Sequence, residues 1–289
     1  MSTDPPVDWT GLAPQLVDAA QQDRAWYLTI ARELVAPGDR LAVDIGCGAA
    51  GMALAIARMM TCGRVVAVDA HPAVLDAARS HIRAEWADPR VRVEPLRADI
   101  PAQTDALRET LGAPADLVWA SASVHHVGDQ QAAITALAGL LAPGGRLALA
   151  EGGLPERHLP WDVGLGEPGL EGRLHAAQDR WFARMRAGLP GSRRMPYGWT
   201  EALQRAGLSP VTTRTTLDEQ PPPLPDSTRR TVLEALAERV GRLRPTGLLT
   251  AADLGAWDRL LDPADEEWLG HRGDLFRLSA RSVHLGVRP

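Results

Sequence analysis

The sequence predicts an α/β protein with a mainly parallel sheet. Between residues 40 and 151, short apolar segments of strand length alternate with helical segments, which is typical of βαβ units. The first apolar segment runs directly into a glycine-rich turn, Gly46-Cys-Gly48. Hydrophobic residues make up 45% of the 289 residues and charged residues 23%, so the chain has enough apolar material for a sizeable core.

The elements of this region follow in order. Residues 11–36 carry a loose apolar stripe and are expected to be helical as far as Pro37-Gly38. Five strands are then expected, at residues 40–45, 64–69, 91–94, 116–120 and 146–150. Helices are expected between them, at residues 52–60, 72–86 and 130–141. Short apolar strands are expected where helices cover both faces of a parallel sheet.

The alternation stops after Glu151. Residues 152–196 are rich in Gly, Pro, Trp and Arg, and the proline run at 221–225 predicts a stiff linker. Further helices are expected at residues 174–187, 199–206, 228–242 and 251–261, with a strand at 210–217 and a strand pair or hairpin at 275–287. We expect the two irregular insertions to cap the carboxyl edge of the sheet.

The composition argues against several classes of protein. Basic residues number 31 and acidic residues 36, for a net charge of −5, whereas broad nucleic-acid binding needs a basic face. No apolar run approaches the ~20 residues of a membrane helix, and residues 1–9 lack the basic start of a signal peptide. Cys47 and Cys62 are too few for a disulfide scaffold or a four-cysteine zinc site. We therefore expect a cytoplasmic protein.

Two residue types are missing altogether. Every basic residue is Arg, and the chain contains neither Lys nor Asn. A lysine base, a lysine Schiff base and an asparagine ligand are therefore excluded from its chemistry.

The strongest motif is Val43-Asp-Ile-Gly-Cys-Gly-Ala-Ala-Gly51. A strand that enters a helix through such a turn is suited to nucleotide binding, because glycines let a ligand approach the backbone and the helix offers free N–H groups. Asp69 ends the second strand, where a carboxylate can accept both ribose hydroxyls. These two features suit a dinucleotide oxidoreductase equally well, and a purely structural turn beside an exposed acid is the alternative.

Two carboxylates separate the nucleotide-binding classes. Asp44 lies inside the first strand, where a dinucleotide-binding fold has an apolar residue. A buried carboxylate costs several kcal/mol unless it is hydrogen-bonded or faces a cation, so Asp44 favours a ligand with an amine or sulfonium. Asp99, in Arg97-Ala-Asp-Ile100, is suited to an adenine amino group.

These motifs carry a family resemblance. The runs VDIGCG, VVAVDA, RADI, ADLVWAS and LLAPGGRLALAE resemble, in order and spacing, the class I S-adenosylmethionine-dependent methyltransferases. The resemblance covers residues 40–151 closely and residues 197–217 and 275–287 loosely. It implies a Rossmann-like, doubly wound, seven-stranded and mostly parallel sheet with an antiparallel seventh strand and helical cap insertions.

The resemblance also implies a domain organisation and a cofactor, S-adenosyl-L-methionine, with S-adenosyl-L-homocysteine as its product. The expected parts are an N-terminal helical lid (1–37), a cofactor-binding core (38–151), a cap insertion (152–196), a continuation of the core (197–220), a second helical insertion (221–272) and the final strands (273–289).

The family's cofactor contacts are carried over only to matching positions. Asp44, Gly46 and Gly48 are expected along the methionine and ribose side. The remaining contacts are expected at the ribose (Asp69, with Ala70 and His71), at the adenine (Asp99, with Ile100) and at the amino-acid end of the cofactor (Ala120 and Ser121). The sequence departs from the family at the third glycine of the turn, which is Ala50 here, and this leaves the exact loop shape open.

Motifs that the chain lacks exclude several classes of methyl acceptor. The chain has Ser121-Ala-Ser-Val-His-His-Val127 where methyltransferases of amide and exocyclic nitrogens have an Asn- or Asp-Pro-Pro-aromatic run. It lacks the Asn of the magnesium site in catechol-type enzymes. His125 and His126 are the candidate general bases, because imidazole suits proton transfer near neutral pH. The alternative is that the pair only shapes the loop. The spacing of the histidines does not call for a metal, so none is expected.

Aromatic side chains are candidates for acceptor binding. Tyr27, Trp161, Tyr197 and Trp199 suit a flat or apolar substrate, and packing within the cap core is the alternative. The sequence thus predicts methyl transfer to a small-molecule acceptor, a specialised metabolite, at an oxygen or else a carbon or nitrogen. Methylation of a peptide's C-terminal carboxylate, a nicotinamide-dependent oxidoreductase and a non-catalytic cofactor-binding relative are the alternatives. We expect neither a nucleic acid nor a membrane as partner, and leave a homodimer open.

Overall fold

The computed structural model describes residues 9–289 of the chain, with side chains from residue 16 onward. Part of the expected N-terminal lid, residues 1–8, lies outside the described residues. The chain divides into two compact units. The core unit contains residues 9–151, 190–214 and 283–289, and the helical unit contains residues 152–189 and 215–282.

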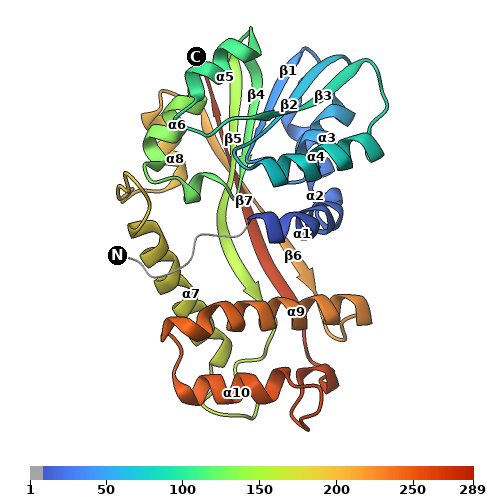
Figure 1. Ribbon diagram of the computed structural model, residues 1–289, viewed down its shortest axis with the longest axis vertical. Coiled ribbons are helices and arrows are strands. Elements are labelled where there is room, and N and C mark those ends of the chain that lie inside the picture. Colours follow the sequence, from blue (N-terminus) through green and yellow to red (C-terminus); the bar gives the residue numbers. More distant parts are fainter. Residues whose placement is uncertain (1–8) are drawn as a thin grey trace. The chain divides into compact units, whose positions relative to one another are not determined.

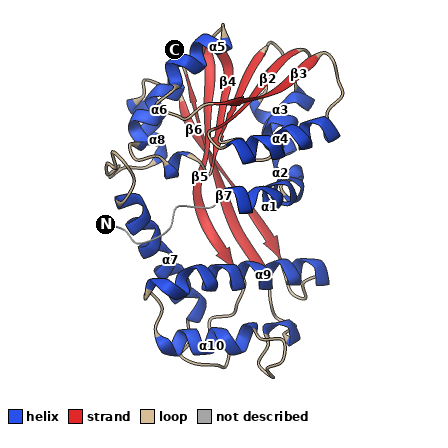
Figure 2. Ribbon diagram, viewed as in Figure 1, coloured by secondary structure: helices blue, strands red, loops and turns tan. Residues whose placement is uncertain are grey.

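One seven-stranded sheet organises the chain (Figures 1 and 2). Its order is β3-β2-β1-β4-β5-β7-β6, and β1 to β5 pair in parallel. The strands are β1 (Leu41–Ile45), β2 (Gly63–Asp69), β3 (Val91–Arg97), β4 (Ala115–Ser121), β5 (Leu141–Arg157), β6 (Val211–Gln220) and β7 (Arg277–Val287). Hydrogen bonds join Gly144 to Arg288 and Phe276 to His158, so β7 runs antiparallel to β5. This confirms the predicted mostly parallel, Rossmann-like sheet.

Helices cover both faces of the sheet in the core unit (Figure 1). Strand residues alternate between the two faces, so in β1 Ala42 joins one apolar cluster, while Leu41, Val43 and Ile45 join the other. The first face is covered by α2 (Arg24–Leu34), α3 (Gly51–Met59) and α4 (Pro72–Glu85), and α1 (Trp9–Gln22) packs against α3 and α4. The second is covered by α5 (Thr104–Leu111), α6 (Gln130–Ala138) and α8 (Trp199–Arg205).

The helical unit has an apolar core of its own. Trp257, Leu236 and Leu174 are fully buried within it. Its helices are α7 (Leu170–Ala187), α9 (Asp226–Leu243) and α10 (Ala251–Leu261). The expected boundaries differ from these units, since residues 190–196 belong to the core unit, and residues 215–220 and 273–282 belong to the helical unit.

Some elements differ from the sequence prediction. The strand expected at 146–150 extends over Leu141–Arg157. At its start, a register shift beside Ala115 and Leu117 includes the Pro143-Gly-Gly145 turn in the strand. Its far end lies beside β7, where the N–H of Phe276 donates to the carbonyl of His158. Residues 277–287 form one strand, not a hairpin. The helix Thr104–Leu111 was not predicted, because eight residues are too few for a helical apolar pattern to be recognised in the sequence.

Candidate functional site

The turn after β1 is built on left-handed backbone. Gly46, Gly48 and Ala50 have φ of 65°, 53° and 62°, and α3 begins directly after them. A Cβ on Gly46 would lie 2.5 Å from Cβ of Ser123, so glycine is required there for packing. A Cβ on Gly48 would meet no atom within 4 Å. The open space beside Gly48 therefore lets a ligand approach the backbone.

Asp44 is buried directly beneath this turn. Its side chain is 2% exposed, and Oδ2 accepts a hydrogen bond of 2.9 Å from the backbone N–H of Ala53. Burial, with a smaller contribution from the nearby charge of Asp69, raises the pKa of this carboxyl to about 7, although the hydrogen bond from Ala53 opposes the shift. A cation above the turn would relieve the cost of keeping this carboxylate charged.

The ends of β2 and β3 place two more acids at the same edge. Asp69 ends β2, and its Oδ1 accepts from the backbone N–H of His71 at 3.0 Å. Its own carbonyl accepts from the N–H of Ala98. Asp99 follows and is exposed, in a loop closed by reciprocal hydrogen bonds with Gln103. The register of the strands therefore brings the predicted ribose and adenine contacts together.

The loop after β4 completes this edge. Ala120 pairs with Ile45 in the sheet, which places Ser121 beside the turn. The hydroxyl of Ser123 donates to the carbonyl of Ile45 at 3.4 Å. His125 and His126 follow in a short 3-10 turn, with their ring centroids 4.2 Å apart. The histidine pair is thus held next to the glycine turn by β1–β4 pairing and by Ser123.

Glu151 is a functional candidate that sequence reasoning missed. It is 4% exposed, and its Oε1 accepts from the backbone N–H groups of Ser123 and Val124 at 3.1 and 2.9 Å. Its Oε2 lies 2.7 Å from Nδ1 of His125. The available signal was an acid directly after the apolar run 146–150, at the carboxyl edge of the sheet.

The other residues predicted to bind the cofactor or the acceptor differ in their burial and in the unit to which they belong. Ala70 and His71 lie at the carboxyl end of β2, and Ile100 packs against the second apolar cluster. Tyr27 packs on Gly51, where a Cβ would lie 2.9 Å from the ring. Tyr197 donates from its hydroxyl to Gln131, and Trp199 packs against the core unit's second cluster. Trp161, in the helical unit, is 71% exposed.

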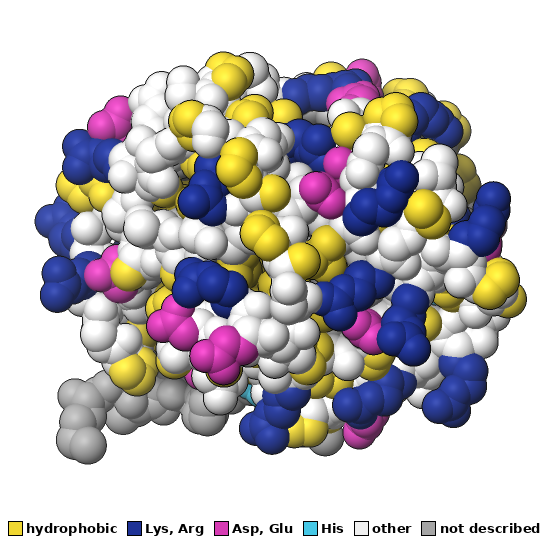
Figure 3. Space-filling model, turned by 90° about the horizontal axis from the view of Figure 1, so that it is seen from above, with side chains coloured by type: hydrophobic (Ala, Val, Ile, Leu, Met, Phe, Trp, Pro, Cys, Tyr) yellow, Lys and Arg dark blue, Asp and Glu magenta, His cyan; other side chains and the backbone are white. Residues whose placement is uncertain are grey.

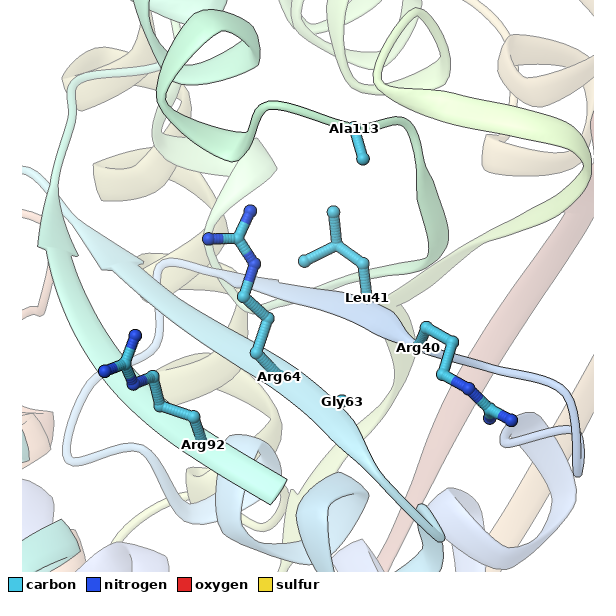
Figure 4. Close-up of a pocket in the computed structure, with 6 residues that line it drawn as sticks. All are labelled: Arg40, Leu41, Gly63, Arg64, Arg92 and Ala113. Atoms are coloured by element: carbon cyan, nitrogen blue, oxygen red, sulfur yellow. The ribbon is translucent and has the colours of Figure 1, made fainter. Parts of the chain in front are cut away.

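A cavity of about 420 Å³ lies at the opposite edge of the sheet (Figure 4). It is lined at the amino ends of the strands by Arg40, Leu41, Gly63, Arg64, Arg92 and Ala113. The face seen from above carries scattered arginines with acidic side chains among them (Figure 3). Because the glycine turn and the acids lie at the carboxyl ends, this cavity is separate from the candidate site.

Within residues 9–289, no group of three or more His, Cys, Asp or Glu side chains is arranged to hold a metal ion. No helix in that range is long and apolar enough to cross a membrane.

The fold and the turn define a nucleotide-cofactor-binding α/β protein, and comparison with known proteins gives its family. The model of the methyltransferase domain matches residues 43–147. An uncharacterized methyltransferase of Mycobacterium tuberculosis is 30% identical over 207 residues, 64% of this chain and 98% of that protein. The chain belongs to the class I S-adenosylmethionine-dependent methyltransferases.

Two further similarities add detail. A trans-aconitate 2-methyltransferase of Methylobacterium radiotolerans is 33% identical over 149 residues, 47% of this chain and 51% of that enzyme. The chain therefore matches about half the length of this relative. A structure from Bacillus halodurans, described as a methyltransferase, shares the fold at 15% identity with a TM-score of 0.50, covering 93% of this chain and 99% of that one.

The cofactor of this class is S-adenosyl-L-methionine, and the site fits it. The open space at Gly48 admits a ligand to the backbone. The buried Asp44 matches a ligand that carries positive charge, and Asp69 offers a carboxylate to the ribose hydroxyls.

Proposed function

We propose that this protein transfers a methyl group from S-adenosylmethionine to an oxygen atom of a small molecule. The observation that carries the proposal is the hydrogen bond between Glu151 and His125 beside the cofactor turn. It supplies an oriented imidazole at the place where an acceptor must meet the methyl group.

Each residue has a proposed part in holding the cofactor. Asp44, Gly46 and Gly48 bind its methionine and ribose side, and Asp69 binds the ribose hydroxyls. Ala70 and His71 lie beside the ribose. Asp99 binds the adenine amino group with Ile100 beside the ring, and Ala120 and Ser121 border the amino-acid end. When bound, the cofactor supplies an electrophilic methyl group on a sulfonium. The protein's task is to place the nucleophile in line, about 3 Å from that methyl.

His125 is the proposed general base. Donation from Nδ1 to the buried Glu151 carboxylate assigns the proton to Nδ1 and leaves Nε2 as the basic nitrogen. Glu151 is itself fixed by two backbone N–H groups, so the ring is oriented before the acceptor arrives. His126, stacked beside it, is the second candidate. A hydroxyl acceptor needs this base, whereas a carboxylate is already ionised and needs only placement.

The acceptor class rests partly on the relatives. One of them is named for trans-aconitate, which is a small organic acid. A small acid or hydroxy acid suits oxygen methylation at this site, whereas a peptide C-terminus is the alternative acceptor. The residues proposed to contact an apolar part of the acceptor are Tyr27, Trp161, Tyr197 and Trp199.

The test is transfer of isotope-labelled methyl to defined acceptors. The panel pairs each small carboxylic acid with its complete methyl ester, each phenol with its methyl ether, and each hydroxy acid with the methyl ester of its methyl ether. Each short peptide, without hydroxyl or acidic side chains, is paired with its C-terminal amide. We expect label in a small acid or hydroxy acid and none in the blocked partner. Label confined to peptides with a free C-terminus would replace the small-molecule proposal, and label in a blocked partner would exclude oxygen as the acceptor atom.

The base is tested separately with His125→Gln. This variant is expected to lower kcat for a hydroxyl acceptor while the affinity for S-adenosylmethionine, measured by calorimetry, stays unchanged. Equal kcat in the variant and the native protein would remove His125 from the mechanism.

A further inference from the structure

A cluster of charged and imidazole side chains lies inside the helical unit and has no part in cofactor binding. It is formed where the ends of β5 and β7 meet α7 and α9. We propose that Arg239, His158 and His175 of this cluster form a binding site for a carboxylate group of a small molecule.

The first observation that supports this site concerns the buried imidazole of His158. It is 1% exposed, and neither ring nitrogen has a hydrogen-bond partner among the described residues. Its nearest carboxylate oxygen, on Glu156, is 3.6 Å from Nε2. Burial lowers the pKa of His158 to about 4, although the charge of Glu156 and the backbone of Phe276 oppose the shift, so the ring is neutral and keeps one N–H to donate. Buried polar groups are almost always satisfied, so an unpaired imidazole indicates a missing partner.

The second observation that supports this site concerns the partners of the Arg239 guanidinium. Its guanidinium donates to Nε2 of His175 at 3.0 Å, and no carboxylate of the described residues lies within ion-pair distance of it. Burial lowers its pKa, although the charges of Glu171 and Glu156 oppose the shift. A guanidinium matches the two oxygens of a carboxylate and binds them in a fork. An anion that enters the cluster would therefore bind Arg239.

The carboxylates already present are engaged elsewhere. Oε1 of Glu156 accepts two hydrogen bonds from Arg277, at 3.2 and 2.9 Å. Glu171 accepts from the backbone N–H groups of His158 and Leu159, and so fixes the chain after β5. Glu171 cannot turn to Arg239 without leaving buried backbone donors unpaired, and a turn of Glu156 would break its two hydrogen bonds with Arg277.

His175 supports the same assignment. Its Nε2 faces both Arg239 and the carbonyl oxygen of Glu156, each at 3.0 Å. A guanidinium only donates, so Nε2 accepts from Arg239 and cannot also donate to the carbonyl. An incoming carboxylate that took the Arg239 donor would free Nε2 of His175 to carry the proton and bond that carbonyl. Binding would thereby satisfy two groups at once.

The site deepens the proposed function and rests on it in one respect, namely that the carboxylate belongs to the acceptor. A free carboxylate that regulates the enzyme has the same chemistry. In either case the bound carboxylate stays unreacted, and no bond is made or broken at this site.

The experiment measures binding of trans-aconitate and citrate to the full-length protein by calorimetry, with and without S-adenosylhomocysteine. The trimethyl esters of both acids are the neutral controls. Arg239→Gln is compared with Arg230→Gln, which removes an exposed arginine from the same helix. We expect saturable binding of at least one acid, no binding of its ester, at least tenfold weaker binding in Arg239→Gln, and native binding in Arg230→Gln.

His158→Leu distinguishes a ligand site from a packing defect. Removing an unpaired buried imidazole is expected to raise Tm, whatever its role. A carboxylate site further requires that the same variant bind the acid more weakly. Higher Tm with unchanged binding, equal binding in Arg239→Gln and native protein, or no binding of either acid would each overturn the proposal.

Two readouts separate this inference from the proposed function. Mutual enhancement of acid and S-adenosylhomocysteine binding would assign the carboxylate to the acceptor, and independent binding would assign it to a regulator. Carboxylate binding in a protein that transfers no methyl group would leave the site standing and overturn the proposed function.

Discussion

The carboxylate of Glu151 binds Nδ1 of His125 across 2.7 Å, although the two residues lie 26 positions apart in the chain. The acid is buried within β5, directly after the last residue of that strand that pairs with β4, while the imidazole is half-buried in the loop after β4. Parallel pairing of β4 with β5 brings them together, because Ser121 pairs with Ala150. The sheet itself therefore positions the candidate base.

Glu151→Gln is expected to lower kcat by about 10²-fold for a hydroxyl acceptor, within the range that general-base catalysis contributes. The glutamine keeps an oxygen for the backbone N–H groups of Ser123 and Val124, but its amide N–H₂ faces Nδ1 of His125. The ring then accepts at Nδ1 and carries its proton on Nε2, so it cannot act as a base. Steady-state kinetics with saturating cofactor measure the change.

Glu109→Gln, at an exposed position of α5, is the matched control and should retain native kcat. The affinity for S-adenosylhomocysteine should be the same in all three proteins. Native turnover by Glu151→Gln would show that the Glu151–His125 bond serves the loop only.

Asp44 predicts a pH dependence of stability. Its folded-state pKa of about 7 lies above the ordinary value of 3.8, so the folded protein binds this proton more tightly than the unfolded chain does. The stabilisation is complete below about pH 4 and is lost as the pH rises through 7. Urea unfolding at pH 5 and pH 8 measures it. Asp44→Asn keeps an acceptor for Ala53 and should lose this part of the pH dependence, and an unchanged slope would contradict the assignment.

The same carboxyl predicts a proton balance on cofactor binding. A positive ligand above Asp44 favours the ionised form and lowers its pKa. Binding of S-adenosylmethionine at pH 6.5 should therefore release a fraction of a proton, seen as a dependence of the calorimetric enthalpy on buffer ionisation. Asp44→Asn should show less release, and equal release by both proteins would assign the proton to another group.

Gly46 and Gly48 should respond differently to alanine. Both have positive φ, so each substitution costs about 1–2 kcal/mol of backbone strain. Gly46→Ala also drives a methyl into Ser123 and should destabilise the fold further, whereas Gly48→Ala meets only open space. Gly48→Ala should thus keep most of its stability yet bind S-adenosylmethionine much more weakly. Thermal unfolding with calorimetry tests both, and native cofactor affinity in Gly48→Ala would place the ligand elsewhere.

The sequence predicted the cofactor edge far better than the acceptor side, for a physical reason. Asp44, Gly48 and Asp69 lie at strand ends, and the order of strands in a parallel sheet fixes where those ends meet. Glu151 was not predicted as a functional residue, because its contact with His125 depends on the conformation of the loop after β4. The cluster around Arg239 depends on packing among α7, α9 and strand ends, for which no local pattern exists.

Trp161 and Trp199 are expected to separate acceptor binding from packing. Trp199 packs against the buried cluster that contains Leu203, so Trp199→Ala should destabilise the core unit by about 2–4 kcal/mol. Trp161 is 71% exposed, so Trp161→Ala should change stability by less than about 0.5 kcal/mol. If Trp161 contacts the acceptor, its variant should raise KM for the acceptor while kcat stays near native. Native KM in Trp161→Ala would remove this residue from the proposed acceptor contacts and leave its exposed ring without a role in turnover.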